Sequence, residues 1–228
     1  MAAITESSYA KLAEPANSDK PLAPTEDDLA QPFPPIPLLV LSTCNVRPYH
    51  ASDIASLSHH ANNKAIAQWM TDRFPSPYTL EASSGWVKTC LDNDAKGERL
   101  NFVIADNKTN QAVGGIGLKP GTDIYHRTIE FGYWLGEEYW SKGIMTEVMR
   151  SFVDYLFEGK MKGRENVNKL AGRAKGGNEG SNKVFRKVGF TLEGTLRENI
   201  FKWGEIHDEW VWGLRKSEWE DRRQRKRE

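Results

Sequence analysis

The chain has 228 residues, of which 39% are hydrophobic and 11% aromatic, enough for one domain with a substantial core. Its 31 acidic and 31 basic residues balance, so no net field favours nucleic acid or an acidic membrane as partner. No apolar run is long enough to cross a bilayer, and the two cysteines have neither metal-ligand nor disulfide spacing. We therefore expect a cytoplasmic protein that binds no metal, nucleic acid or membrane.

The two ends of the chain differ in composition from the part between them. Residues 1–36 are rich in proline and have little apolar periodicity, which predicts a disordered N-terminal tail. Residues 37–215 carry the periodic segments and form the predicted domain. Residues 216–228 are basic but interspersed with acids, which favours a solvated C-terminal helical tail.

The periodic segments, taken in chain order, indicate an α+β domain. A strand over 37–50 precedes helical stretches over 51–70 and 79–94. Three strands, a long helix, a strand, a helix and a closing antiparallel pair follow, at 99–106, 111–119, 127–136, about 141–158, 168–174, 178–189, 190–199 and 205–214. Antiparallel strands followed by strand–helix–strand crossovers predict a mixed sheet.

The long helix begins with an unusual residue. Ile144, Val148, Phe152 and Leu156 form the apolar stripe of an amphipathic helix, yet Gly143, a poor helix former, lies at its start. The first amides of a helix lack internal partners and carry partial positive charge, so a bare backbone there lets an anion approach. The alternative is that the glycine only eases a tight turn, and the spacing alone leaves both readings open.

Two other glycine-rich segments do not fit nucleotide motifs. In "GGIGLKPG", residues 114–121, Pro120 stands where a dinucleotide-binding fingerprint needs a glycine and the start of a helix. "GGNEGSNK", residues 176–183, lacks the Gly-Lys-Ser/Thr ending of a P-loop. Neither nucleotide-binding fold is predicted.

Several fragments together resemble the GNAT family of acetyl-CoA-dependent N-acetyltransferases, especially its Rim-type branch, which acts on ribosomal-protein N-termini. They are "NVRPYHASD", "IEFGYWLGEEYWSKGIMTEV", "NEGSNKVFRKVGF", "GFTLEGTLREN" and "HDEWVWGL", in this order over about residues 38–215. The resemblance implies a GNAT fold: a mixed sheet of about seven strands with an antiparallel N-terminal part and helices on both faces. A bulge would splay the parallel fourth and fifth strands, and acetyl-CoA would be the cosubstrate.

The resemblance also implies which residues bind the cosubstrate. The family's pyrophosphate loop falls on Trp140, Ser141, Lys142, Gly143, Ile144 and Met145, and Thr146 adds a hydroxyl. Exposed backbone groups of Trp134 and Leu135 would hold the acyl-pantetheine arm, one N–H acting as an oxyanion donor. Asn178 matches an asparagine that contacts this arm, and it is also suited to cap the following helix.

Catalytic roles are expected on one strand and one helix. Much of the family protonates the leaving thiolate with a tyrosine, but Phe185 occupies that position and has no proton to donate. Ser181 is the nearby hydroxyl that the Rim-type branch uses to orient or protonate the sulfur. Glu130 alternates onto the strand face opposite the apolar residues and is the expected base, acting directly or through water.

The predicted function is transfer of an acetyl group from acetyl-CoA to a primary amine by direct attack through a tetrahedral intermediate. The acceptor is a protein N-terminus or a small amine, selected by the early helices, about 52–93, and the late hairpin, about 194–209. The alternative is a non-catalytic GNAT fold that binds CoA as a sensor or scaffold. Either a monomer or a homodimer fits the sequence.

Overall fold

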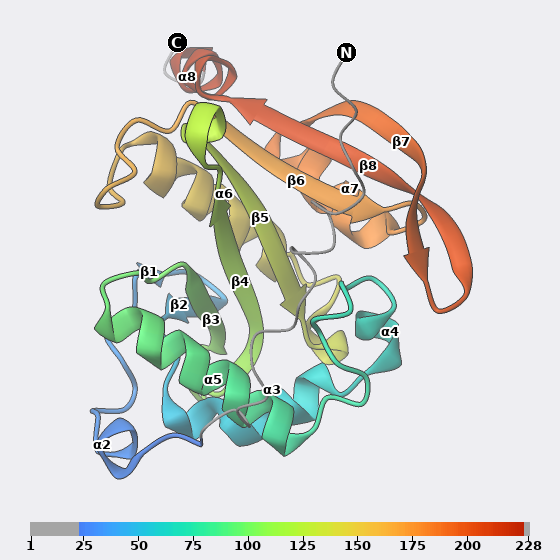
Figure 1. Ribbon diagram of the computed structural model, residues 1–228. Coiled ribbons are helices and arrows are strands. Elements are labelled where there is room, and N and C mark those ends of the chain that lie inside the picture. Colours follow the sequence, from blue (N-terminus) through green and yellow to red (C-terminus); the bar gives the residue numbers. More distant parts are fainter. Residues whose placement is uncertain (1–22, 226–228) are drawn as a thin grey trace, which may run out of the picture.

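Figure 1 shows the computed structural model, which describes residues 23–225. A single eight-stranded sheet in the order β1-β2-β3-β4-β5-β6-β8-β7 runs through the molecule. Neighbouring strands are antiparallel except β5 and β6, which are parallel. The strands are β1 Leu39–Val40, β2 Cys44–Arg47, β3 Asn101–Asp106, β4 Ala112–Pro120, β5 Thr128–Leu135, β6 Lys169–Lys175, β7 Thr191–Lys202 and β8 Glu205–Arg215.

Helices cover both faces of this sheet, as the family resemblance implies (Figure 1). The α-helices are α2 Glu26–Leu29, α3 Ile54–Ala61, α4 Lys64–Ala67, α5 Leu80–Ala95, α6 Ile144–Phe157, α7 Glu179–Val188 and α8 Lys216–Arg225. Three short 3-10 helices are η1 Ala51–Asp53, η2 Asp123–Tyr125 and η3 Glu137–Tyr139. No helix among residues 23–225 combines the length and the apolar character needed to cross a bilayer.

The strand predicted over 37–50 is a hairpin of two strands, β1 and β2, which accounts for eight strands where about seven were expected. The turn of this hairpin is held by Glu147 on α6. Its carboxylate accepts hydrogen bonds from Ser42 N and Thr43 Oγ1, both at 2.7 Å. A contact between residues about a hundred positions apart leaves no local signal in the sequence, and the apolar run therefore reads as one strand.

Alternation along the strands divides the core into two layers. Phe102 and Ile104 of β3 face the larger layer with α6 and α7, whereas Val103 and Ala105 face the smaller layer with α3 and α5. The apolar stripe of α6 is buried in the larger layer, with Val148, Phe152 and Leu156 all at 0% exposure. The predicted periodicity of α6 is confirmed, although the helix begins at Ile144.

The described part of the predicted N-terminal tail, residues 23–36, carries the one-turn helix α2 and contacts the domain where the sequence predicts disorder. The Arg47 guanidinium lies over the Phe33 ring, 5.2 Å from its centroid. His50 Nε2 is 3.0 Å from the carbonyl oxygen of Gln31. Residues 1–22 of that tail and residues 226–228 of the C-terminal tail lie outside the described residues.

A buried ion pair supports this region, and we expect its loss to be costly. Arg47 and Asp53 are 0% and 1% exposed and form two hydrogen bonds, of 2.8 and 2.7 Å. Asp53→Asn leaves the arginine charge buried without its counterion, so it should lower the free energy of unfolding by about 3–5 kcal/mol. Urea denaturation measures this change. Glu218→Gln, which breaks the exposed Arg215–Glu218 pair, is the control and should change stability by less than about 1 kcal/mol.

Candidate functional site

The parallel strands β5 and β6 separate part-way along their length. They pair from Thr128↔Lys169 to Phe131↔Gly172, and β5 then continues to Leu135 with no partner in β6. The predicted splay of the two parallel strands is therefore present. No bulge causes it, because the β4–β5 register runs without a shift, which corrects the expected mechanism of splaying.

The register also decides which backbone groups face the opening. Gly136 N donates to Val113 O at 2.8 Å, so this antiparallel pair is a hydrogen-bonded one. Because hydrogen-bonded pairs alternate along such a ladder, the backbone of Trp134 also bonds to β4. The backbone of Leu135 points the other way, into the opening. The prediction that the Trp134 backbone is free to hold the acyl-pantetheine arm is therefore wrong. The same prediction for Leu135 stays a prediction.

The Trp134 side chain lies on the opposite face of β5 from the larger core layer. Its ring meets that of Phe74 edge-on, with 5.7 Å between centroids. Gly115 of β4 makes room for the indole, since a Cβ there would lie 3.0 Å from Trp134 Nε1. The "GGIG" run is thus part of strand β4, and its glycines provide space for neighbouring side chains. This agrees with the prediction that the run is not a nucleotide-binding motif.

The loop before α6 has a backbone suited to binding an anion. Ser141 and Gly143 both have positive φ, +60° and +81°, and Gly143 is the N-cap residue. No side chain caps this end of α6, whereas Thr79 caps α5 and Asn178 caps α7. A Cβ on Gly143 would meet no atom within 4 Å. The first amides of α6 therefore face open space with their partial positive charge.

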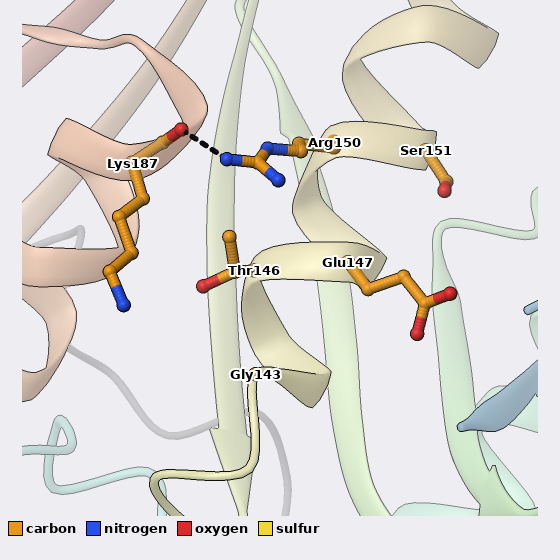
Figure 2. Close-up of a pocket in the computed structure, with 6 residues that line it drawn as sticks. All are labelled: Gly143, Thr146, Glu147, Arg150, Ser151 and Lys187. Atoms are coloured by element: carbon orange, nitrogen blue, oxygen red, sulfur yellow. Dashed lines mark hydrogen bonds between the residues drawn. The ribbon is translucent and has the colours of Figure 1, made fainter. Parts of the chain in front are cut away.

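A groove of about 600 Å³ runs from this helix end between α6 and α7 (Figure 2). Arg150 Nη2 donates to the Lys187 carbonyl at 2.8 Å and ties the two helices together. Burial raises the pKa of Glu147, but the hydrogen bonds from Ser42 and Thr43 outweigh it and hold that pKa below its usual value. Of the remaining lining residues, Arg150 and Lys187 give the groove cationic groups, Thr146 and Ser151 give hydroxyls, and Gly143 gives only its backbone.

The other predicted loop residues contribute in different ways. The side chains of Ile144 and Met145 are 6% and 7% exposed and pack into the core, so only their backbone is available to a ligand. The Lys142 ammonium lies over the Tyr139 ring at 5.3 Å from its centroid. A second hollow, of about 320 Å³, lies beside Tyr139 and is lined in part by Lys108 and Lys142.

Trp140 joins the phosphate loop to the end of β5. Its indole Nε1 donates a hydrogen bond of 2.7 Å to the Leu135 carbonyl oxygen. That contact occupies one acceptor position of the Leu135 carbonyl oxygen and leaves the Leu135 N–H as a free donor. Trp140 stands where the family usually has Gln or Arg, and this hydrogen bond gives the tryptophan a structural role.

We expect Trp140→Phe to weaken CoA binding modestly, because it removes this hydrogen bond and keeps an aromatic ring. A net loss of about 1 kcal/mol corresponds to a roughly fivefold higher Kd. Isothermal titration with CoA measures it, with Trp203→Phe on the exposed hairpin end as the control. An unchanged Kd in Trp140→Phe would show that the bond to Leu135 does not position the loop.

Helix α7 brings together the residues predicted from the family's second motif. Asn178 Oδ1 accepts a hydrogen bond of 3.1 Å from Ser181 N, so the capping role is present. Phe185 is 1% exposed and stacks on Trp212 at 5.7 Å between centroids. Gly172 permits this packing, because a Cβ on it would lie 2.3 Å from the Phe185 ring. Phe185 therefore serves the core.

Glu130 lies on the face of β5 opposite the core, as predicted, among charged neighbours that the sequence did not indicate. Its carboxylate accepts hydrogen bonds from Lys119 Nζ at 3.0 Å and Arg173 Nε at 3.2 Å. Arg173 also bonds to Glu209 at 2.9 Å. These partners come from β4, β6 and β8, so only strand pairing reveals them.

The two regions expected to select the acceptor meet in space. Lys202 of the β7–β8 hairpin bonds to Asp72, in the segment between α4 and α5, at 2.7 Å. Lys175, at the end of β6, lies over Trp69 of the same segment at 4.8 Å from the ring centroid. The segment therefore spans from the Trp134 ring to the end of β6, beside the opening. Neither contact was predicted.

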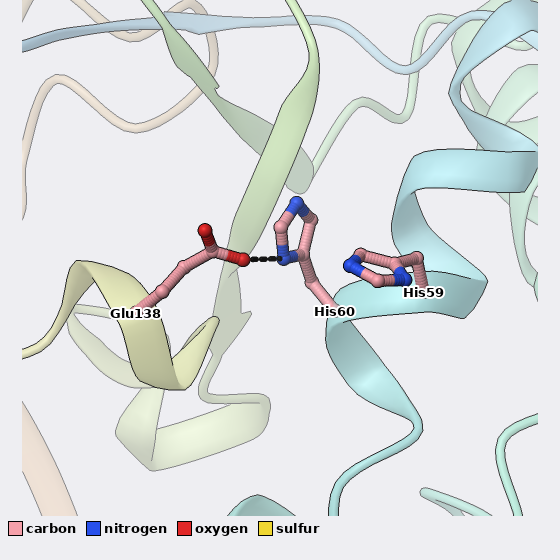
Figure 3. A group of neighbouring side chains, drawn as sticks. All are labelled: His59, His60 and Glu138. Carbon is pink, nitrogen blue, oxygen red and sulfur yellow. Dashed lines mark ion pairs between the residues drawn. The ribbon is translucent and has the colours of Figure 1, made fainter.

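Figure 3 shows a further cluster, of His59 and His60 on α3 with Glu138 on η3. His60 Nδ1 is 3.1 Å from a Glu138 oxygen, and burial lowers the pKa of His60 while Glu138 opposes this effect. The His60 ring lies between the other two side chains and meets His59 edge-on at 4.9 Å (Figure 3). The pair of His60 and Glu138 thus forms a contact between α3 and η3.

Comparison with known proteins places this geometry in a family. The family model described as acetyltransferase (GNAT) domain matches residues 44–191, more than half of the chain. A putative ribosomal N-acetyltransferase, YdaF of Bacillus subtilis (strain 168), is 36% identical over 121 residues, which are 53% of this chain and 63% of that protein. The matched region thus spans less than two thirds of this relative.

Solved structures agree on the fold. A GNAT acetyltransferase from Bacillus anthracis aligns with TM-score 0.67 and 17% identity over 78% of this chain and 98% of its own. RimJ of Mycobacterium smegmatis, solved in complex with CoA-disulfide, aligns with TM-score 0.63 and 22% identity over 77% and 83%. The family model, the relative and the splayed strands agree with the resemblance seen in the sequence, and the chain belongs to the GNAT acetyltransferase family.

Proposed function

We propose that this protein transfers the acetyl group of acetyl-CoA to a primary amine. The observation that carries the proposal is the connection between two parts of the site. The hydrogen bond from Trp140 to Leu135 joins the uncapped N-terminus of α6 to the end of β5, which has no partner in β6. One part suits the phosphates of CoA, and the other suits the acyl-pantetheine arm.

The backbone and side chains at this site fit such a ligand. Gly143 leaves space where an anion would approach the amides, and Thr146, Arg150 and Lys187 add polar and cationic groups along the groove. The bound cosubstrate would supply an acetyl thioester, which is activated towards an amine. The Leu135 N–H, which faces the opening, is the donor placed to stabilise the oxyanion formed by attack.

The acceptor amine would approach from the other face of the sheet. Glu130 lies on that face, where its carboxylate accepts hydrogen bonds from Lys119 and Arg173, and a carboxylate is a suitable proton acceptor for an amine. Glu130 takes the proton from the amine directly or through water. The segment between α4 and α5, joined to the hairpin by Asp72 and Lys202, borders this face and would select the acceptor.

Two acceptor classes follow from the chemistry and from the relatives. A protein N-terminus is one, because YdaF is named a putative ribosomal N-acetyltransferase. A small primary amine is the other, since both present the same nucleophile. The non-catalytic sensor is less well supported, because Glu130 and the proposed oxyanion donor lie on the same strand, β5, in a chain of an acetyltransferase family.

The test combines calorimetric titration with acetyl-CoA and CoA and an assay of free thiol release. The thiol assay uses a panel of primary amines and of peptides with free N-termini. Micromolar binding of both CoA forms and amine-dependent thiol release are expected. Binding without release for any amine would favour the sensor, and the absence of binding would contradict both.

A further inference from the structure

A tyrosine that the sequence did not single out lies where the strands separate. Tyr133 of β5 is two residues beyond Phe131, the last residue of β5 that pairs with β6. Its side chain is on the core face, towards α7, and its ring centroid is 5.9 Å from that of Phe185. Tyr133 is therefore close to the position where much of the family has its tyrosine.

The hydroxyl of Tyr133 is buried and has no hydrogen-bond partner among the described residues. Burial raises the pKa of this phenol well above its usual value, and the neighbouring Ser181 hydroxyl opposes that effect only in part. Ser181 is close enough to affect this pKa, but the two hydroxyls form no hydrogen bond of good geometry. Buried polar groups are nearly always paired in folded proteins, so an unpaired one here indicates that a ligand supplies the partner.

We propose that the Tyr133 hydroxyl donates a hydrogen bond to the thioester sulfur of bound acetyl-CoA and stabilises the departing thiolate, with Ser181 beside it. This inference rests on the proposed function, because it requires CoA in the opening between β5 and β6. It also explains how the chain can have Phe185 at the position where much of the family has a tyrosine. The phenol that the family places on the helix is lost there, and a phenol on the facing strand takes over its role.

The amine nitrogen forms a bond to the acetyl carbon, and the amine proton passes to Glu130 or to water. The C–S bond then breaks and its electron pair goes to sulfur. Because the raised pKa keeps Tyr133 protonated, its hydroxyl donates a hydrogen bond to the thiolate without losing the proton. CoA leaves as the thiolate and takes up a proton from solvent.

The test is Tyr133→Phe, with Tyr155→Phe as the control because Tyr155 packs on the same core layer. The substitution removes an unpaired buried hydroxyl, so the variant should fold with an equal or higher melting temperature. The main readout is the pKa of the thiol of unacetylated CoA bound to the protein. It is measured from the ultraviolet absorbance of the thiolate during a pH titration. This readout needs no turnover, and a purely structural role would not move it.

In the wild type, the bound thiol should have a pKa below that of free CoA, because the donor stabilises the thiolate. Tyr133→Phe should reduce its acid dissociation constant about tenfold and lower kcat on the order of 10²-fold, while the Kd for CoA stays within about twofold. Tyr155→Phe should change none of these quantities.

Three results separate this inference from the proposed function. An identical thiol pKa in the wild type and Tyr133→Phe would overturn the role of Tyr133, even if the enzyme acetylates amines. A thiol pKa that depends on Tyr133, without acetylation of any amine, would support the donor and overturn the proposed reaction. Failure of the wild type to bind CoA would overturn both.

Discussion

Gly143→Val should raise the Kd for CoA on the order of 10²-fold, which corresponds to about 2.7 kcal/mol of binding free energy. The valine side chain would occupy the open space in front of the first amides of α6, where no protein atom lies within 4 Å of the Cβ position. A β-branched residue is also strained at the φ of +81° found there. Calorimetric titration with CoA measures the effect.

Gly97→Val separates the two causes. Gly97 has a φ of +77° and open space around its Cβ position, but it follows α5, away from the loop before α6. Both variants should lose about 1–3 kcal/mol of stability from backbone strain, and only Gly143→Val should lose CoA affinity. Equal CoA affinity in folded Gly143→Val and wild type would remove this helix end from the binding site.

Glu130→Gln should lower kcat on the order of 10²–10⁴-fold and leave the Kd for CoA unchanged. The amide keeps the size of the side chain but is a far weaker proton acceptor. CoA binding is unaffected because Glu130 faces away from the core layer that holds α6 and α7. Steady-state kinetics with an amine identified in the thiol-release assay, together with titration of CoA, measure both quantities.

Glu209→Gln is the matched control for this variant. Glu209 bonds to Arg173, as Glu130 does, so the control breaks an ion pair of the same network and keeps the carboxylate on β5. If Glu130 is the base, Glu209→Gln retains most of the activity. Equal losses of kcat in the two variants would assign the effect to the charge network, and a normal rate in Glu130→Gln would assign proton removal to water or to the substrate.

Features that depend on residues a few positions apart could be predicted from the sequence. The buried stripe of α6 and the end of α7 at Gly189, with a φ of +104°, follow from helical periodicity and from glycine chemistry. Local reasoning made the helix start at Gly143 a candidate anion site, with a tight turn as the alternative, and the family resemblance extended the candidate loop to Trp140. The family resemblance added the antiparallel N-terminal part of the sheet and the splay of the parallel strands.

Features that depend on strand pairing could not be predicted. Whether Trp134 or Leu135 directs its backbone into the opening is set by the β4–β5 register, and a shift of one residue would exchange their roles. The cations around Glu130 come from two other strands, and the ring of Tyr133 meets that of Phe185 only when α7 packs on the sheet.

The sequence by itself determined the longer helices α5, α6 and α7, the glycine at the start of α6 and the family, because these depend on short-range periodicity and on the order of motifs. The tertiary structure decided which groups face the acyl site, which charges surround Glu130 and which segments border the acceptor. These contacts join residues far apart in the chain, such as Asp72 and Lys202, and they form only when the sheet and its helices assemble.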